Sequence, residues 1–162
     1  MSAEATITRL AARLARPEPL SGDEQEELRL TVREAGRTNL YFFCKAVLGF
    51  ADLSPTFHRA VCAFCQGPAP LKLIELPRGH LKTTIGTIGF SLWRVTQTPN
   101  LRILLRSSTA TNAYKWINLL QAHLLSNPLY AWLYPEIIPP DLSQVRWRED
   151  ALEVRRTEHW PE

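Results

Sequence analysis

Features that would assign this 162-residue chain to a membrane or secreted class are missing. No apolar run is long enough to span a bilayer, and the longest are interrupted by Arg or Lys. The N-terminus lacks the shape of a signal peptide, because Arg9, Arg13 and Arg16 interrupt its apolar positions. The chain has three cysteines, and an odd number without an export signal favours free thiols over disulfides. We therefore expect a cytoplasmic protein with no membrane partner.

What the sequence does contain is enough apolar residues for one domain and an uneven distribution of charge. Hydrophobic residues make up 45% of the chain, which suffices for a real core. The net charge is only +3, but residues 51–110 hold seven Lys or Arg against two acidic residues, a local net charge of +5. A positive excess of this kind suits a phosphate ligand or a nucleic acid. Chance placement of five charges is the alternative.

Hydrophobic periodicity and turn residues predict the order of the elements. A capping-box spacing, Ser21 with Glu24, starts one helix, and Ser54-Pro55 starts another. Short apolar runs bounded by Pro and Gly read as buried strands. The pattern predicts helices at 2–16, 21–36, 38–48, 54–66, 82–97 and 111–125 with a short one inside 127–140, strands at 71–76 and 101–105, and a weaker antiparallel pair at 145–148 and 151–156.

The alternation of strand, helix, strand and helix from residue 71 onward predicts the fold class. Such an order is typical of a right-handed βαβ crossover, which places parallel strands in one sheet. We expect an α/β domain with helices on both faces of a parallel sheet. The predicted organisation is an N-terminal helical region at residues 1–36 and an α/β domain at residues 37–162.

The stretch Leu71–Thr84 is the strongest functional signal in the chain. It reads as a buried strand that stops at Pro77, a short turn, and a helix that opens with Lys82, Thr83 and Thr84. Phosphate-binding loops are built in this way, because backbone N–H groups at the turn and at the helix N-terminus point at an anion. Lys82 would add a charge near the β- and γ-phosphates, and the Thr83 hydroxyl would hold Mg²⁺.

The loop departs from the strict phosphate-loop pattern at two glycine positions. The pattern requires Gly six positions and one position before the lysine, where this chain has Leu76 and Leu81. Only Gly79 remains within the turn. The alternative interpretation is an ordinary strand-to-helix turn whose Arg78 and Lys82 are solvated.

Two further groups of residues invite a site assignment. Cys62 and Cys65 lie one helical turn apart, with His58 one turn earlier, and a zinc site would need Cys44 as a fourth ligand. Buried thiols are the favoured interpretation, because structural zinc spacing usually comes from knuckles. Phe57 and His58 stand just upstream of the loop, where nucleotide enzymes commonly offer a base-contacting residue, although a partly buried histidine is the simpler interpretation.

The acidic residues required for phosphoryl transfer are not evident. Such a site needs one acid for Mg²⁺ and another to position water, each normally following an apolar strand. Four acids stand late in the chain, and none follows such a strand: Glu136, Asp141, Glu149 and Asp150.

Taken together, the motifs resemble the large terminase subunits of tailed bacteriophages. Leu-Pro-Arg-Gly-His-Leu-Lys-Thr-Thr is similar to that family's variant Walker A loop, in which an Arg-first loop replaces the glycine-first one. Ser-Pro-Thr-Phe-His-Arg resembles its adenine-side element, and Leu-Arg-Ile-Leu-Leu-Arg-Ser-Ser-Thr its second core strand. Ser-Asn-Pro-Leu-Tyr-Ala-Trp-Leu-Tyr-Pro-Glu resembles its next helix and turn. The likeness covers about residues 38–160.

The resemblance implies an ATP-driven motor that packages double-stranded DNA into procapsids. It implies a helicase-like P-loop ATPase domain, a separate metal-dependent nuclease domain, ATP and Mg²⁺ as cofactors, and a homo-oligomeric ring. The implied partners are double-stranded DNA, the portal protein and the small terminase subunit, in the cytoplasm of the host cell.

Position by position, the resemblance assigns roles to the residues of the loop. Lys82 would hold the phosphates, Thr83 the Mg²⁺, and Arg78 would reach the γ-phosphate. Phe57 and His58 would lie near the adenine. The nucleotide-contacting set is Phe57, His58, Pro77, Arg78, Gly79, His80, Leu81, Lys82, Thr83 and Thr84, with Lys82 and Arg78 as the catalytic residues.

The chain also departs from the family. Many members have Gly where Leu81 stands, which puts the backbone path there in doubt. No apolar strand ending in paired acids is found, so the Walker B motif, catalytic glutamate and nuclease domain would lie beyond Glu162. We expect this piece alone to turn over little or no ATP. The alternatives are a non-catalytic, truncated module that binds DNA or a capsid partner, and another helicase-like ATPase.

Overall fold

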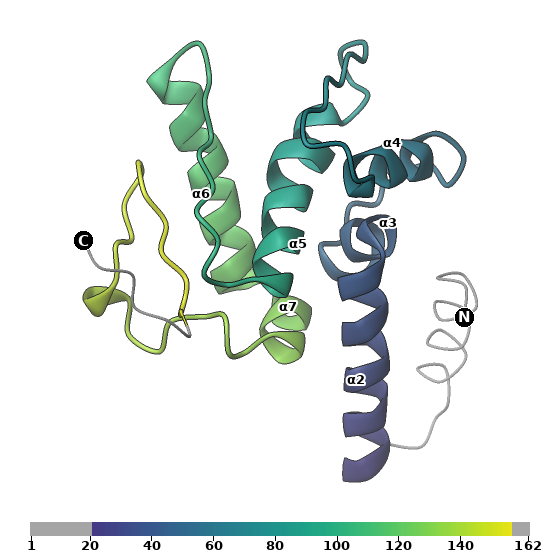
Figure 1. Ribbon diagram of the computed structural model, residues 1–162. Coiled ribbons are helices and arrows are strands. Elements are labelled where there is room, and N and C mark those ends of the chain that lie inside the picture. Colours follow the sequence, from purple (N-terminus) through teal and green to yellow (C-terminus); the bar gives the residue numbers. More distant parts are fainter. Residues whose placement is uncertain (1–20, 157–162) are drawn as a thin grey trace.

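The computed structural model describes residues 21–156, so the helix predicted at residues 2–16 lies outside the described part. Within that part the architecture is all-helical (Figure 1). Its elements are α2 (Gly22–Thr38), α3 (Leu40–Phe42), the π-helix η1 (Phe43–Val47), α4 (Phe57–Gln66), the π-helix η2 (Thr84–Gly89), α5 (Phe90–Gln97), α6 (Ala110–Ser126), α7 (Pro128–Leu133) and the 3-10 turn η3 (Leu142–Gln144). Between residues 21 and 156, no helix combines the length and the hydrophobicity needed to cross a bilayer.

Local capping signals account for where the helices begin and end. The predicted capping box is confirmed, since the Glu24 N–H donates to Ser21 Oγ and the Ser21 N–H donates to the Glu24 carboxylate. Asn39 caps α3 by accepting a hydrogen bond from the Phe42 N–H at 2.8 Å. Gly49 adopts a φ of 75°, the left-handed conformation that a helix-ending glycine takes without strain. The Ser21 and Asn39 caps satisfy amides that helix geometry leaves without an acceptor.

The helices predicted at 38–48 and 82–97 are both found, and each contains a π-helical segment. The first continues from α3 into η1, and the second runs from Lys82 through η2 into α5. Glycine permits the close approach of the two π segments, because a Cβ added to Gly89 would lie 2.4 Å from the Cys44 sulfur. π-helical turns are rare, and they are frequently found at functional sites.

An aromatic cluster fills the core beneath α2. Tyr130 and Tyr134 are fully buried and meet the Phe43 ring edge-on, with centroids 6.2 Å apart in each pair. The Arg33 guanidinium lies over the Tyr134 ring, pairs with the Glu136 carboxylate and donates to the Leu133 carbonyl. Through these contacts α7 is fixed against α2.

The side chains of Trp93 and Gln66 join α5 and α4 to the rest of the core through hydrogen bonds. The Trp93 indole N–H donates to the Gly36 carbonyl at 3.0 Å, which fixes α5 to the end of α2. The Gln66 side chain accepts from the Leu40 N–H and donates to the Thr38 carbonyl, so it bridges the junction of α2 and α3. The elements on both sides of the loop at residues 77–84 are therefore anchored.

The predicted parallel sheet is wrong: residues 21–156 contain no sheet, and neither 71–76 nor 101–105 forms a strand. Alternation of exposure persists in the first segment, where Lys72, Ile74 and Leu76 are half-buried while Leu71 and Leu73 are 90% and 77% exposed. The physical reason is that a strand needs a partner strand for its peptide groups, and two strands alone are at best marginally stable. Apolar composition marks a segment as strand-like but does not supply that partner.

The antiparallel strands predicted at 145–148 and 151–156 are not formed, and a single β-bridge is found in their place. Trp147 and Leu152 form the only isolated β-bridge among the described residues, supported by the Glu153 N–H donating to the Arg146 carbonyl. The Arg155 N–H donates to the Ile137 carbonyl and ties this hairpin to the end of the helical core.

Candidate phosphate-binding loop

Residues 77–84 form an exposed turn that leads directly into a helix. The His80 N–H donates to the Pro77 carbonyl at 3.5 Å, which closes a turn with Arg78 and Gly79 at its centre. Gly79 has a φ of 83°, a conformation that glycine adopts without steric cost. The helix begins at Lys82, as the sequence predicts.

Leu81 is the unusual residue of the loop. Its φ is 52°, and no other non-glycine residue in the described range 21–156 has a positive φ. A left-handed conformation costs a side-chain-bearing residue roughly 1–2 kcal/mol. The Leu81 side chain is half-buried and packs against the hydrophobic core, which holds the residue in place. Strain of this kind persists where the surroundings enforce it, and it clusters at ligand-binding sites.

The helix that starts at Lys82 presents backbone donors to the loop. Its first turn contains no intrahelical acceptor for its leading amides, and the first amide bonded back into the turn is that of Ile85, which donates to the Leu81 carbonyl at 2.9 Å. These N–H groups carry the positive end of the helix dipole. The geometry therefore provides donors for an anion beside Gly79 and Leu81.

Two cationic side chains flank these donors. The Lys82 ammonium folds back on the loop and donates to the Leu76 carbonyl at 2.7 Å. Arg78 is exposed and forms no ion pair with any residue of the described part. Thr83 and Gly79 are also exposed, so the hydroxyl and the turn are open to a ligand.

The structure brings one of the two upstream aromatic residues to the loop. The Phe57 and His80 rings meet edge-on with their centroids 5.6 Å apart, and Phe57 is 41% exposed. His58 instead lies inside, 8% exposed, with Nδ1 accepting the Ser54 N–H at 2.8 Å. The contact of Phe57 with His80 was not predicted, because nothing in the sequence relates side chains more than twenty positions apart.

The backbone N–H of Ser54 donates a hydrogen bond to His58, and this bond fixes the tautomer of the imidazole ring. Because Nδ1 accepts, the neutral ring carries its proton on Nε2, and that atom has no hydrogen-bond partner among the described residues. His58 is 8% exposed, so it is more deeply buried than the partly buried histidine that the sequence suggested.

The cysteines lie in the core and not in the loop. Cys44, Cys62 and Cys65 are all free and buried, as the favoured interpretation predicts. A hydrogen bond to Cys62, together with burial, raises the pKa of the Cys44 thiol, and burial raises the pKa of the Cys65 thiol. Within the range 21–156, no three His, Cys, Asp or Glu side chains are grouped so that they could hold a metal ion.

The loop at residues 77–84 thus has the donors and cations to bind an anion. Its Mg²⁺ ligand from the protein would be Thr83, with water and phosphate oxygens completing the shell. Comparison of the chain with protein-family models, with curated proteins and with solved structures gave no match.

Proposed function

We propose that this chain binds the triphosphate of Mg·ATP through residues 77–84, as part of an ATP-driven phage DNA-packaging motor. The observation that carries the proposal is the left-handed backbone of Leu81 directly before Lys82. It stands where the phosphate-loop pattern has glycine, so leucine takes a conformation that glycine would take freely. Strained backbone conformations cluster at ligand-binding sites, so the conformation of Leu81 supports a binding role for the loop.

Each polar group of the loop has a role in this proposal. The amides of the first helical turn bind the β-phosphate oxygens, and Lys82 leaves the Leu76 carbonyl to contact the β- and γ-phosphates. Thr83 holds Mg²⁺ and Thr84 supports the loop. Arg78, exposed at the turn, reaches the γ-phosphate.

The base of the nucleotide is expected on the side of the loop where the Phe57 ring meets His80. Phe57 offers an exposed aromatic face at that position. Because His58 is buried, it supports Phe57 from inside and does not contact the ligand.

The wider part of the proposal rests on the resemblance to large terminase subunits. In that setting the chain is the N-terminal ATPase portion of the motor, which acts in the host cytoplasm on double-stranded DNA with the portal protein and the small subunit. Anion binding by the loop needs only the turn and the helix N-terminus, so it does not depend on a sheet.

This chain by itself is expected to bind nucleotide with little or no hydrolysis. Phosphoryl transfer requires acids that hold the metal and position water, and the late acids Glu136, Asp141, Glu149 and Asp150 follow no apolar strand in the sequence. The second candidate is a non-catalytic module that holds DNA or a capsid partner, and it is favoured by the local net charge of +5 in segment 51–110.

Calorimetric titration of the full chain with Mg·ATP separates the two candidates. Lys82→Ala should weaken binding roughly 10- to 100-fold, because a charged hydrogen bond contributes about 1.5–3 kcal/mol. The matched control is Lys115→Ala, which removes an exposed lysine that lies on α6, outside the loop. It should leave the affinity unchanged. Equal weakening by both variants, or DNA binding with no nucleotide binding at all, would reject the phosphate-loop proposal.

A further inference from the structure

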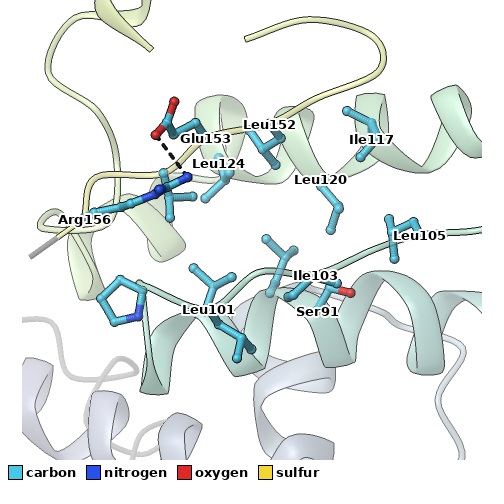
Figure 2. A pocket seen from close by; sticks show the side chains of 14 residues that line it. Ser91, Leu101, Ile103, Leu105, Ile117, Leu120, Leu124, Leu152, Glu153 and Arg156 are labelled. Atoms are coloured by element: carbon cyan, nitrogen blue, oxygen red, sulfur yellow. Dashed lines mark ion pairs between the residues drawn. The ribbon is translucent and has the colours of Figure 1, made fainter. Parts of the chain in front are cut away.

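The apolar cavity drawn in Figure 2 is separate from the candidate phosphate-binding loop. It opens between α5, α6, residues 101–105 and the C-terminal hairpin, and its volume is about 90 Å³. None of its fourteen lining residues belongs to α4 or to residues 77–84. The cavity therefore adds nothing to the site at the loop, where the exposed part of the Phe57 ring provides the aromatic surface instead.

The tip of the turn, residues 78–80, has no polar contact with the rest of the described fold. Within residues 21–156, no hydrogen bond or ion pair links Arg78, Gly79 or His80 to a residue outside the turn at 77–80. The tip instead meets α4 through the His80 ring, which lies edge-on to the Phe57 ring with the planes at 72°. Aromatic pairs of this geometry stabilise by more than the area that they bury.

His80 connects the backbone of the turn with the ring on α4. Its Nδ1 lies 3.2 Å from the Arg78 carbonyl oxygen, which can only accept, so Nδ1 carries a proton and donates. On the other side of the contact, the Phe57 ring meets the His58 ring with the centroids 5.2 Å apart. His58 is buried and bonded to the Ser54 N–H, so the α4 side of the contact is fixed. The His80 side chain thus sets where the turn lies relative to Phe57.

We infer that His80 is a positioning residue, whose ring aligns the phosphate-binding turn with Phe57 so that one nucleotide contacts both. The inference rests on the proposed function of the loop. A triphosphate that carries a base joins two contacts in one ligand, and the second contact adds affinity only when the spacing of the two is already set. Inorganic tripolyphosphate contacts the turn alone and gains nothing from this alignment. His80 therefore favours nucleotides over bare polyphosphates.

The test compares the affinities of Mg·ATP and of magnesium tripolyphosphate, measured by calorimetric titration of the full chain. His80→Asn keeps a donor for the Arg78 carbonyl but removes the ring. It should weaken ATP binding roughly 2- to 10-fold, the factor that one aromatic pair contributes, and leave the affinity for tripolyphosphate unchanged. His80→Phe keeps a ring at this position and should bind ATP as the wild type does.

A double variant distinguishes positioning from a general loss of structure. Phe57→Ala should weaken ATP binding at least as much as His80→Asn, and both changes together should cost no more than Phe57→Ala alone, because His80 acts through Phe57. Phe64→Ala, at another exposed ring on α4, should leave both affinities unchanged.

The two ligands also separate this inference from the proposal on which it rests. A His80→Asn protein that loses affinity for both ligands equally, or for neither, would overturn the role of His80 and leave phosphate binding intact. A wild type that binds neither ligand would reject phosphate binding by the loop, and the role of His80 with it.

Discussion

Leu81 provides the most informative perturbation, because its left-handed backbone makes glycine and alanine exchange their usual order of stability. At an ordinary position, glycine is less stable than alanine by about 0.5–1 kcal/mol, since it loses more backbone freedom on folding. At a left-handed position, alanine carries strain of roughly 1–2 kcal/mol that glycine avoids. Both variants of Leu81 lose the same packing of the leucine side chain against the core, so their comparison isolates the backbone.

The matched control lies two residues further on. Thr83 has a φ of −70° and a ψ of −41°, an ordinary helical conformation, and its side chain is exposed. Thr83→Gly should therefore be less stable than Thr83→Ala by about 0.5–1 kcal/mol. Leu81→Gly should be more stable than Leu81→Ala by up to about 1.5 kcal/mol, which is the strain less the cost of glycine's flexibility.

The assay is urea unfolding of the four variants. Their free energies of unfolding are obtained with one shared value for the dependence on urea concentration. At each position, the free energy of unfolding of the alanine variant is subtracted from that of the glycine variant. The result at position 81 should exceed the result at position 83 by the whole left-handed strain, about 1–2 kcal/mol, because the entropic cost of glycine is the same at both positions and cancels. Glycine less stable than alanine by the same amount at both positions would show that Leu81 is unstrained, and the argument from its conformation would fail.

Two further predictions concern the core and use the same unfolding measurement. Gly89→Ala should destabilise the protein by about 1–3 kcal/mol, because the new Cβ would lie 2.4 Å from the Cys44 sulfur. Adding Cys44→Ala should recover part of that loss, and an equal cost with and without Cys44 would contradict the contact. Tyr130→Phe should raise stability by about 1 kcal/mol or more, because the buried Tyr130 hydroxyl has no hydrogen-bond partner within residues 21–156. A loss of stability would instead reveal an acceptor for that hydroxyl.

The helices could be predicted from the sequence because their signals are local. Ser21 and Glu24 are three residues apart and form the capping box that their spacing indicates. The helix start at Lys82 likewise follows from the turn that precedes it. The π segments η1 and η2 were not predicted, and they pack together where Gly89 meets Cys44, a contact between residues far apart in the sequence.

The sheet failed as a prediction because pairing is not local. Leu71–Leu76 and Leu101–Leu105 have the composition and the alternation of strands, yet a strand exists only when another strand meets its peptide groups. The loop itself could be located from its residue types. The left-handed conformation of Leu81 could not be predicted, because leucine rarely adopts it. The contact between Phe57 and His80 could not be predicted either, because it depends on the fold.

The central claim is that residues 77–84 bind a triphosphate through backbone amides and Lys82. The most direct measurement is a titration of isotope-labelled protein with Mg·ATP, followed through the backbone amide resonances. The account predicts large, saturable shifts of the amides of Gly79 and of Lys82 to Thr84, and their loss in Lys82→Ala. Shifts confined to other segments, or shifts of the loop that persist unchanged in Lys82→Ala, would contradict it.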